Sequence, residues 1–159
     1  AVLQPVLTRH TAVERVNVER LRANAVEAAE QTERLSVPEV RPPVDLARLI
    51  AGWPDGRRLL MCDETGGGPP IAEALAGLDA AACAAPWAIL VGPEGGFAEA
   101  ELTDLRRIRD AMAVGLGPRI LRADTAALAA LACWQALVGD WRQPTPRLAA
   151  DYRTSKGSV

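Results

Sequence analysis

The sequence has few of the residues on which disulfide frameworks and metal sites depend. Its 159 residues include three cysteines, Cys62, Cys83 and Cys133, which lie far apart, have apolar neighbours and form no Cys-x-x-Cys pair. This pattern predicts small buried hydrophobic side chains in a reducing compartment and argues against a metal site. The length is sufficient for one domain with a core that needs no covalent staple.

Long apolar runs are also missing. No stretch reaches the roughly 18 residues that a membrane span requires, and the first residues lack the regions of a signal peptide. We therefore expect a cytoplasmic protein. Residue 1 is Ala, and residues 2–7 already have the pattern of a strand within a fold, so we expect a further segment to precede them in the natural protein.

An excess of basic charge is absent as well. The net charge of -2 gives no general attraction to nucleic acid. Basic residues nevertheless gather locally, because Arg106, Arg107 and Arg109 share one segment and Arg119 and Arg122 flank a glycine-rich loop. The first group is either a solvated helix face or part of a local nucleic-acid patch.

The sequence contains one histidine, His10, in a polar stretch far from any Ser or Cys elbow. This gives little support to an ordinary nucleophile triad, and we expect His10 to be a surface residue. Neither a G-x-G-x-x-G fingerprint nor a phosphate-binding Gly-Lys-Ser/Thr motif is present. Because Glu94 would repel phosphate, the glycine-rich loops favour a ligand without a phosphate chain.

Hydrophobic periodicity predicts alternating strands and helices. Helical spacing appears in residues 17–34, 71–78, 98–112 and from Asp124 or Thr125 to about Trp141, and Asp45 is placed to cap a short helix through Ile50. Short apolar runs predict strands in residues 2–7, 58–63, 88–91 and 113–116. Residues 80–86 give no clear prediction.

This alternation predicts an α/β fold, with a parallel sheet and helices on both of its faces. We expect one domain over residues 1–142 and a loosely ordered tail over residues 143–159. The helix expected over residues 124–141 is apolar nearly all round, so a partner surface should bury its second side. A homodimer is the simplest source of that surface.

Three of the predicted strands run directly into glycine-rich loops, which cover residues 64–70, 92–97 and 117–122. Carboxyl ends of parallel strands form one sheet edge, so such loops can form walls of one ligand pocket. Glycine also allows a flat ring to rest against bare backbone. The alternative for Gly92–Gly96 is a tight strand-to-helix turn, with Glu94 stabilised by the helix that follows.

In the last loop, Arg119 and Arg122 bracket two aliphatic residues that can line a pocket while an arginine faces a polar substrate. For Asp124, which follows at the helix start, the sequence favours an N-cap role.

Together these motifs resemble a known family. They are Val91-Gly92-Pro93-Glu94-Gly95-Gly96-Phe97, Leu116-Gly117-Pro118-Arg119-Ile120-Leu121-Arg122 and Asp124-Thr125-Ala126. Upstream matches are Pro5-Val6, Arg9, Asn17, Arg20, Glu27-Ala28-Ala29-Glu30-Gln31, Arg34 and Val37-Pro38. Over residues 1 to about 141, the chain resembles the RsmE-type 16S ribosomal RNA methyltransferases of the SPOUT superfamily.

The resemblance implies S-adenosylmethionine as methyl donor and N3 of a uridine in the decoding region of 16S rRNA, within the 30S subunit, as acceptor. It also implies a C-terminal trefoil knot, which is a rare exception to the rule against threaded chains. Family members act as homodimers, here through the C-terminal helix.

Roles for individual residues follow from the same resemblance. Those that would hold the cofactor are Met61, Cys62, Asp63, Glu64, Gly92, Pro93, Glu94, Gly95, Gly96, Leu116, Gly117, Pro118, Ile120 and Leu121. Those that would contact RNA are Arg9, Arg119 and Arg122. Arg122 would stabilise negative charge on the uracil carbonyl edge, and Glu94 is either the base or a structural residue.

The chain departs from the family pattern in two places. Ala123-Asp124-Thr125 stands where the family has Thr-Glu-Thr, so a direct role of that carboxylate in catalysis is not supported. Family members also carry an N-terminal RNA-binding barrel, a strand and a helix before the point where this sequence starts. Two alternatives remain open, a non-catalytic knot module that binds cofactor or RNA, and a SPOUT enzyme that acts on transfer RNA.

Overall fold

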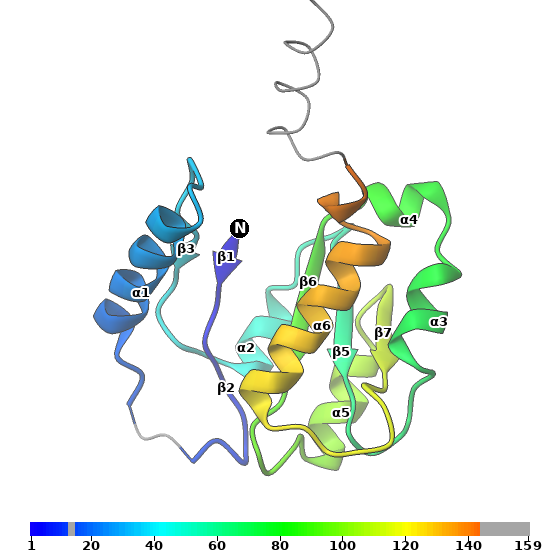
Figure 1. Cartoon of the computed structure of the whole chain (residues 1–159). Helices are drawn as coiled ribbons and strands as arrows, with labels where there is room; N and C mark the ends of the chain where they lie inside the picture. The colour runs from blue at the N-terminus through cyan, green and yellow to red at the C-terminus, as the bar shows by residue number, and fades with distance from the viewer. Residues whose placement is uncertain (13–14, 144–159) are drawn as a thin grey trace, which may run out of the picture. The chain divides into compact units, whose positions relative to one another are not determined.

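The computed structural model describes residues 1–12 and 15–143, which form two compact units (Figure 1). Within the described residues, unit 1 consists of Ala1–Arg57 and Gly92–Ala111, and unit 2 of Arg58–Val91 and the residues from Met112 onward. A single domain over residues 1–142 stays a prediction. The predicted tail falls outside the described residues from position 144 onward.

Unit 1 combines short parallel strand pairs with helices. Its elements are β1 (Val2–Leu3), β2 (Val6–Leu7), α1 (Val18–Gln31), β3 (Glu39–Val40), β4 (Val44–Asp45), α2 (Leu46–Ala51) and α5 (Glu99–Arg106). Strand β1 pairs with β3 and β2 pairs with β4, both in parallel. The expected strand over residues 2–7 is therefore present as two pieces, because Pro5 has no N–H to donate and lies between them.

Helix α1 begins where the sequence predicts it. The side chain of Asn17 accepts the N–H of Arg20 at 2.9 Å and so caps the first turn. The helix ends three residues before the predicted end, and Glu33, just beyond it, has a φ of 55° that no helix continues through. The helix packs against β3, and Ala29 is its buried residue.

The helix expected over residues 98–112 is shorter than predicted. Leu102, Leu105 and Ile108 are buried as the helical spacing indicates, but α5 ends at Arg106. Asp110 then has a φ of 62° and redirects the backbone, so Met112 belongs to a strand. The apolar side chain of Met112 matches both periods, which is why the sequence pattern overextends the helix.

Unit 2 is built around a three-stranded sheet in the order β6-β5-β7. Its elements are β5 (Arg58–Cys62), α3 (Ile71–Ala76), α4 (Ala80–Ala84), β6 (Trp87–Val91), β7 (Ala111–Val114), α6 (Ala123–Leu137) and the 3-10 turn η1 (Asp140–Arg142). Strands β5 and β6 pair in parallel from Arg58 opposite Trp87 to Cys62 opposite Val91. The first residue of β7, Ala111, is assigned to unit 1.

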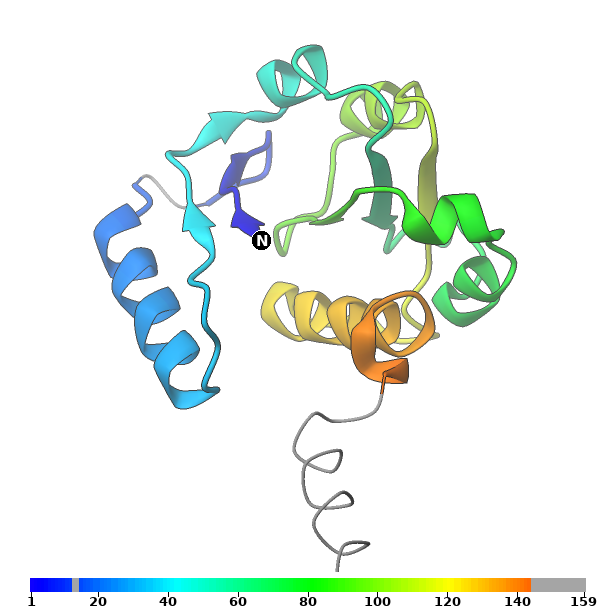
Figure 2. The same cartoon turned by 90° about the horizontal axis from the view of Figure 1, so that it is seen from above.

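The core of unit 2 lies on one face of the sheet, where α3 and α6 pack (Figure 2). Leu60 of β5 and Val114 of β7 are fully buried there against Ile71, Leu75 and Ala130 from the two helices. Alternate residues of a strand point to opposite faces, so Leu59 and Met61 point the other way, and both are also buried. Central strand β5 is thus apolar on both faces, as a buried parallel strand requires.

Two further differences from the sequence prediction concern helices. Residues 80–84, for which the pattern gave no prediction, form α4, and the Asp79 carboxylate caps it by accepting the Ala82 N–H at 2.7 Å. Helix α6 starts at Ala123 and ends at Leu137, short of the expected Trp141. Within the described ranges, none of the helices combines the length and apolarity needed to cross a membrane.

Candidate functional site

The loop after β5 is organised by Asp63, whose carboxylate is buried. Asp63 Oδ1 accepts both the backbone N–H and the hydroxyl of Thr65, at 2.9 and 2.6 Å. The Asp63 N–H donates to the carbonyl of Val114 at 2.9 Å and so extends the sheet by one residue. Satisfied by these hydrogen bonds, the Asp63 side chain shapes the loop. Met61, two residues earlier, has its side chain fully buried in the core.

This first loop is fastened to the start of the last one. The Gly115 N–H donates to the Pro69 carbonyl at 2.9 Å, and the Ile71 N–H donates to the Gly115 carbonyl at 3.0 Å. Gly68 packs directly on the backbone of Ala113 and Val114, and a Cβ there would overlap their atoms. Residues 63–70 and 115–122 therefore leave the sheet edge as joined segments.

The loop after β7 presents backbone and apolar side chains to solvent. Gly117 has a φ of 108°, which an L side chain rarely adopts, and nothing lies within 4 Å of where its Cβ would stand. Ile120 is 81% exposed although it is a large hydrophobic residue, and Arg119 is exposed beside it. Ile120 lies between Arg119 and half-buried Leu121, so this loop holds a large apolar side chain open to solvent.

Arg122 lies where this loop joins α6. Its backbone carbonyl accepts the Ala126 N–H at 2.8 Å and so occupies the N-cap position, and its side chain is exposed. The N-cap prediction for Asp124 is therefore wrong. Asp124 lies inside the first turn, where its carboxylate accepts the Thr125 N–H at 2.7 Å and where negative charge is favourable.

The loop after β6 belongs to unit 1. Gly92 packs against the ring of Phe97, and a Cβ at Gly92 would lie 3.0 Å from a ring carbon. Gly96 has a φ of 66°, and its N–H donates to the Pro93 carbonyl at 2.9 Å, which closes a tight turn. Glu94 is exposed in this turn. Gly96 is thus required by its backbone conformation, whereas Gly92 leaves room for the Phe97 ring.

Cys62 lies at the end of β5, and burial changes the acidity of its thiol. Burial raises the pKa of the Cys62 thiol to about 11 from an ordinary 9.0, and nearby Cys133 adds to this shift. Because the thiolate is the nucleophile, the folded protein keeps Cys62 unreactive.

We expect Cys62 to react with iodoacetamide at pH 9 about fifty-fold more slowly in the folded than in the unfolded chain, since about 1% rather than half of it is ionised. The folded state holds the proton more tightly, so the contribution of this group to stability is present below pH 9 and is lost as the pH rises towards 11. Peptide mapping after timed alkylation measures the rate for each cysteine. Equal rates in the two states would contradict the shift.

Comparison with known proteins identifies the family. The model of the RNA methyltransferase domain family matches residues 1–135. The chain belongs to this family.

Relatives of this RNA methyltransferase domain carry a common name. This chain is 31% identical over 128 residues to ribosomal RNA small subunit methyltransferase E of Rickettsia conorii. The match covers 80% of this chain and 50% of that protein. The protein of the same name from Bacillus subtilis is 36% identical over 114 residues, covering 71% of this chain and 44% of the relative. The chain therefore spans about half the length of the curated relatives it matches.

Solved structures show the same α/β fold. Ribosomal RNA small subunit methyltransferase E from Neisseria gonorrhoeae, bound to S-adenosyl methionine, is 30% identical with a TM-score of 0.74, over 88% of this chain and 56% of that one. A putative methyltransferase from Legionella pneumophila, in complex with SAM, is 25% identical with a TM-score of 0.71, over 86% and 55%.

In this methyltransferase domain, the predicted site residues are divided between the two units, and those of unit 2 are brought together. Asp63 and the segment that begins at Leu116 are joined through Val114 and Gly115, as described above. Gly92–Gly96 has its contacts in unit 1, and one of them was missed by sequence analysis. The imidazole Nδ1 of His10 lies 2.9 Å from the Gly95 carbonyl oxygen. No motif marked this contact, since His10 stands alone in a polar stretch far from Gly95 in sequence.

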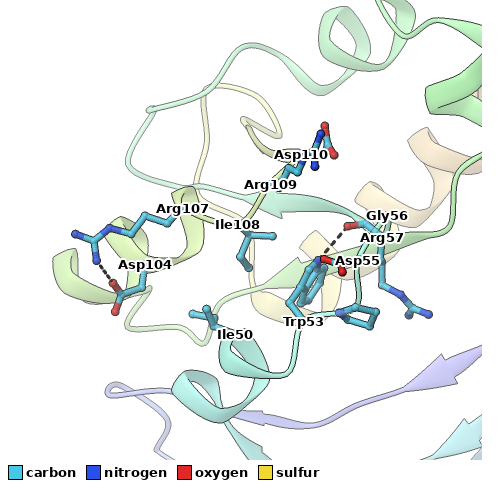
Figure 3. Close-up of a pocket in the computed structure, with 11 residues that line it drawn as sticks. Ile50, Trp53, Asp55, Gly56, Arg57, Asp104, Arg107, Ile108, Arg109 and Asp110 are labelled. Carbon is cyan, nitrogen blue, oxygen red and sulfur yellow. Dashed lines mark hydrogen bonds and ion pairs between the residues drawn. The ribbon is translucent and has the colours of Figure 1, made fainter.

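The structure also contains a cavity of about 670 Å³ that sequence analysis did not predict (Figure 3). Ile50, Trp53 and Ile108 supply apolar side chains to it. Its charged lining residues are three arginines and three aspartates, Arg57, Arg107, Arg109, Asp55, Asp104 and Asp110. These three positive and three negative residues give the lining no net formal charge. All of its lining residues belong to unit 1.

A search of the described residues for three or more His, Cys, Asp or Glu side chains that together suit a metal ion yields no group.

Proposed function

We propose that this chain is the methyl-transferring part of an S-adenosylmethionine-dependent rRNA methyltransferase, acting on N3 of a uridine in the decoding region of 16S rRNA within the 30S subunit. Membership of the RNA methyltransferase family and the shared name of the relatives support the reaction class and the small-subunit rRNA substrate. The loop motifs quoted from the sequence support the choice of uridine N3.

The observation that carries the proposal is the exposed backbone of the last loop. At Gly117, a positive φ is combined with open space where a side chain would stand, so a planar ligand can approach the peptide groups directly. Apolar surface from half-buried Leu116 and exposed Ile120 lies in the same segment. Backbone groups and aliphatic side chains together suit an adenine ring and need no phosphate-binding lysine. The residues of this loop therefore suit the adenine part of S-adenosylmethionine.

The cofactor would be held by the backbone of Cys62–Glu64, Gly92–Gly96 and Leu116–Leu121. When bound, S-adenosylmethionine supplies a methyl group on a positively charged sulfur. The chain has to favour loss of the proton from uridine N3, because only the deprotonated nitrogen has the electron pair that accepts the methyl group. The guanidinium of Arg122 stabilises the negative charge that then spreads to the uracil oxygens. Glu94, an exposed carboxylate, is the candidate for taking the proton.

For RNA binding we propose Arg9, Arg119 and Arg122. All three are exposed, so their guanidinium groups are accessible to phosphate oxygens. Because the net charge of the chain is -2, binding to RNA would depend on such local groups rather than on a general field.

We further propose that α6 mediates a homodimer. Leu128 and Leu131 are 70% and 50% exposed on this helix, whereas Ala126 and Ala130 are buried, with Ala130 in the core of unit 2. A helix that is apolar on its outer side as well is expected to be covered by a second copy. We also propose that the chain beyond β7 forms the trefoil knot of the SPOUT superfamily, and the fastening of residues 63–70 to Gly115 supports this.

The direct test is titration calorimetry with S-adenosylmethionine. We expect saturable binding to the chain, and methyl transfer from labelled cofactor by the native protein to 30S subunits isolated from cells that lack the modification. Primer extension, which stops at an N3-methylated uridine, reports the position. Absence of saturable binding would overturn the enzyme proposal, and methylation of transfer RNA in place of 30S subunits would overturn the substrate.

A further inference from the structure

A closed turn at Thr8–Thr11 presents Arg9 and His10 at its tip. The Thr11 N–H donates to the Thr8 carbonyl at 3.1 Å, and the Thr8 N–H donates to the Thr11 hydroxyl at 2.9 Å. The two threonine hydroxyl oxygens also lie 3.0 Å apart. One hydrogen bond between backbone groups and one to a side chain thus close the turn. Together they fix the orientation of Arg9 and His10, which lie between the two threonines.

One carboxylate connects this turn to the start of α5. Glu101 Oε1 accepts the Arg9 N–H at 2.8 Å, and Glu101 Oε2 accepts the Ala98 N–H at 2.9 Å. Ala98 is the N-cap residue of α5, and its N–H is one of those that a helix start leaves without an intrahelical partner. The far side of the Gly92–Gly96 loop is thereby held to the turn.

His10 holds the loop itself. Its Nδ1 lies 2.9 Å from the Gly95 carbonyl oxygen, and because a carbonyl only accepts, Nδ1 carries the proton. The Gly96 N–H, in the same peptide unit, donates to the Pro93 carbonyl. Both polar groups of the Gly95–Gly96 peptide are therefore bound, and its plane cannot rotate without breaking two hydrogen bonds. Packing reinforces this, since a Cβ at Gly95 would lie 3.0 Å from the His10 Cβ.

We propose that His10 is a positioning residue for cofactor binding, which acts by fixing the Gly95–Gly96 peptide of the glycine loop. This inference rests on the proposed function, in which Gly92–Gly96 contacts S-adenosylmethionine. A fixed loop binds tighter because it loses less conformational freedom when the ligand arrives. His10 touches the loop and not the reacting atoms.

The test compares His10→Ala with His10→Asn. Asparagine carries an amide nitrogen at the same number of bonds from Cβ as Nδ1, so it can donate to the Gly95 carbonyl. We expect His10→Ala to raise the Kd for S-adenosylmethionine about five- to ten-fold, the loss of one hydrogen bond, and His10→Asn to return it to within about two-fold of the wild type. Thr103→Ala, an exposed change on α5 outside this contact, is the matched control and should leave the Kd unchanged.

A second measurement separates positioning from general destabilisation. Amide NMR spectra of the ligand-free proteins should show shifts at Gly95 and Gly96 in His10→Ala that Asn reverses, at an unchanged melting temperature. Equal cofactor affinity of wild type and His10→Ala would overturn the inference, and so would equal losses in both His10 variants. If the wild type itself shows no saturable binding, the proposed function fails and the inference falls with it.

Discussion

Replacing Arg122 by alanine is expected to lower methyl transfer to 30S subunits by about 100- to 1,000-fold, the usual effect of removing one donor that stabilises developing negative charge. The Kd for S-adenosylmethionine should stay nearly constant, because the Arg122 guanidinium is proposed to contact the uracil oxygens and not the cofactor. The effect therefore falls on the turnover rate rather than on cofactor binding.

The alanine substitution keeps the backbone hydrogen bond that Arg122 makes. Arg122 contributes to α6 through its carbonyl, which accepts the Ala126 N–H and remains in the alanine variant. Its side chain makes no N-cap hydrogen bond to the helix. Arg122→Lys keeps the charge but loses the planar two-pronged donor, so an intermediate rate is expected.

Arg48→Ala is the matched control, since it removes one exposed arginine from helix α2, outside all three glycine loops. It should leave the rate within about two-fold of the wild type, as expected for a single surface charge remote from a site. Single-turnover measurements with labelled cofactor give the rates. Equal rates for Arg122→Ala and Arg48→Ala would remove Arg122 from the catalytic role.

The second large effect is expected on stability. Gly68→Ala should lower the free energy of unfolding by about 2–4 kcal/mol, because the new methyl group overlaps the backbone of Ala113 and Val114. These are backbone atoms of a sheet strand, which cannot turn aside as a flexible side chain can. Relief requires the loop to move away from β7, and that movement breaks the hydrogen bond from the Gly115 N–H to the Pro69 carbonyl.

Gly77→Ala provides the comparison within the same unit. Gly77 follows α3 with a φ of -80°, which alanine adopts readily, and its nearest neighbour would lie 3.6 Å from the added Cβ. Its stability should change by less than about 1 kcal/mol. Urea unfolding followed by circular dichroism measures both variants, and a Gly68→Ala protein as stable as the Gly77→Ala protein would show that the loop does not pack on β7.

Local signals in the sequence predicted most of the elements. Alternation of apolar runs and glycine loops located β5 and β6 and placed the start of β7 two residues too late, and helical spacing located the start of α1. These features depend on neighbouring residues, so a single sequence contains them. The end of α5 could not be predicted from neighbouring residues. It depends on the backbone turning at Asp110, whose positive φ leads the chain into β7.

The candidate site was predicted less completely for the same reason. Glycine-rich segments could be recognised as loops from composition, but contacts between distant residues could not. His10 and Gly95 are joined by a hydrogen bond that no spacing rule indicates, and Glu101 joins two segments through one carboxylate. Asp63 appeared as a ligand residue, and its burial and its bonds to Thr65 give it a part in shaping the loop.

The strand order of unit 2 sets the timing of folding. Strand β5 lies between β6 and β7, and its last hydrogen bond, from Asp63 to Val114, joins residues far apart along the chain. Closing so long a loop costs conformational entropy before any contact compensates for it, so such pairings form slowly. Strand β7 is therefore expected to dock last, and a nascent chain would complete the edge that carries two of the three glycine loops only after α5 has been synthesised.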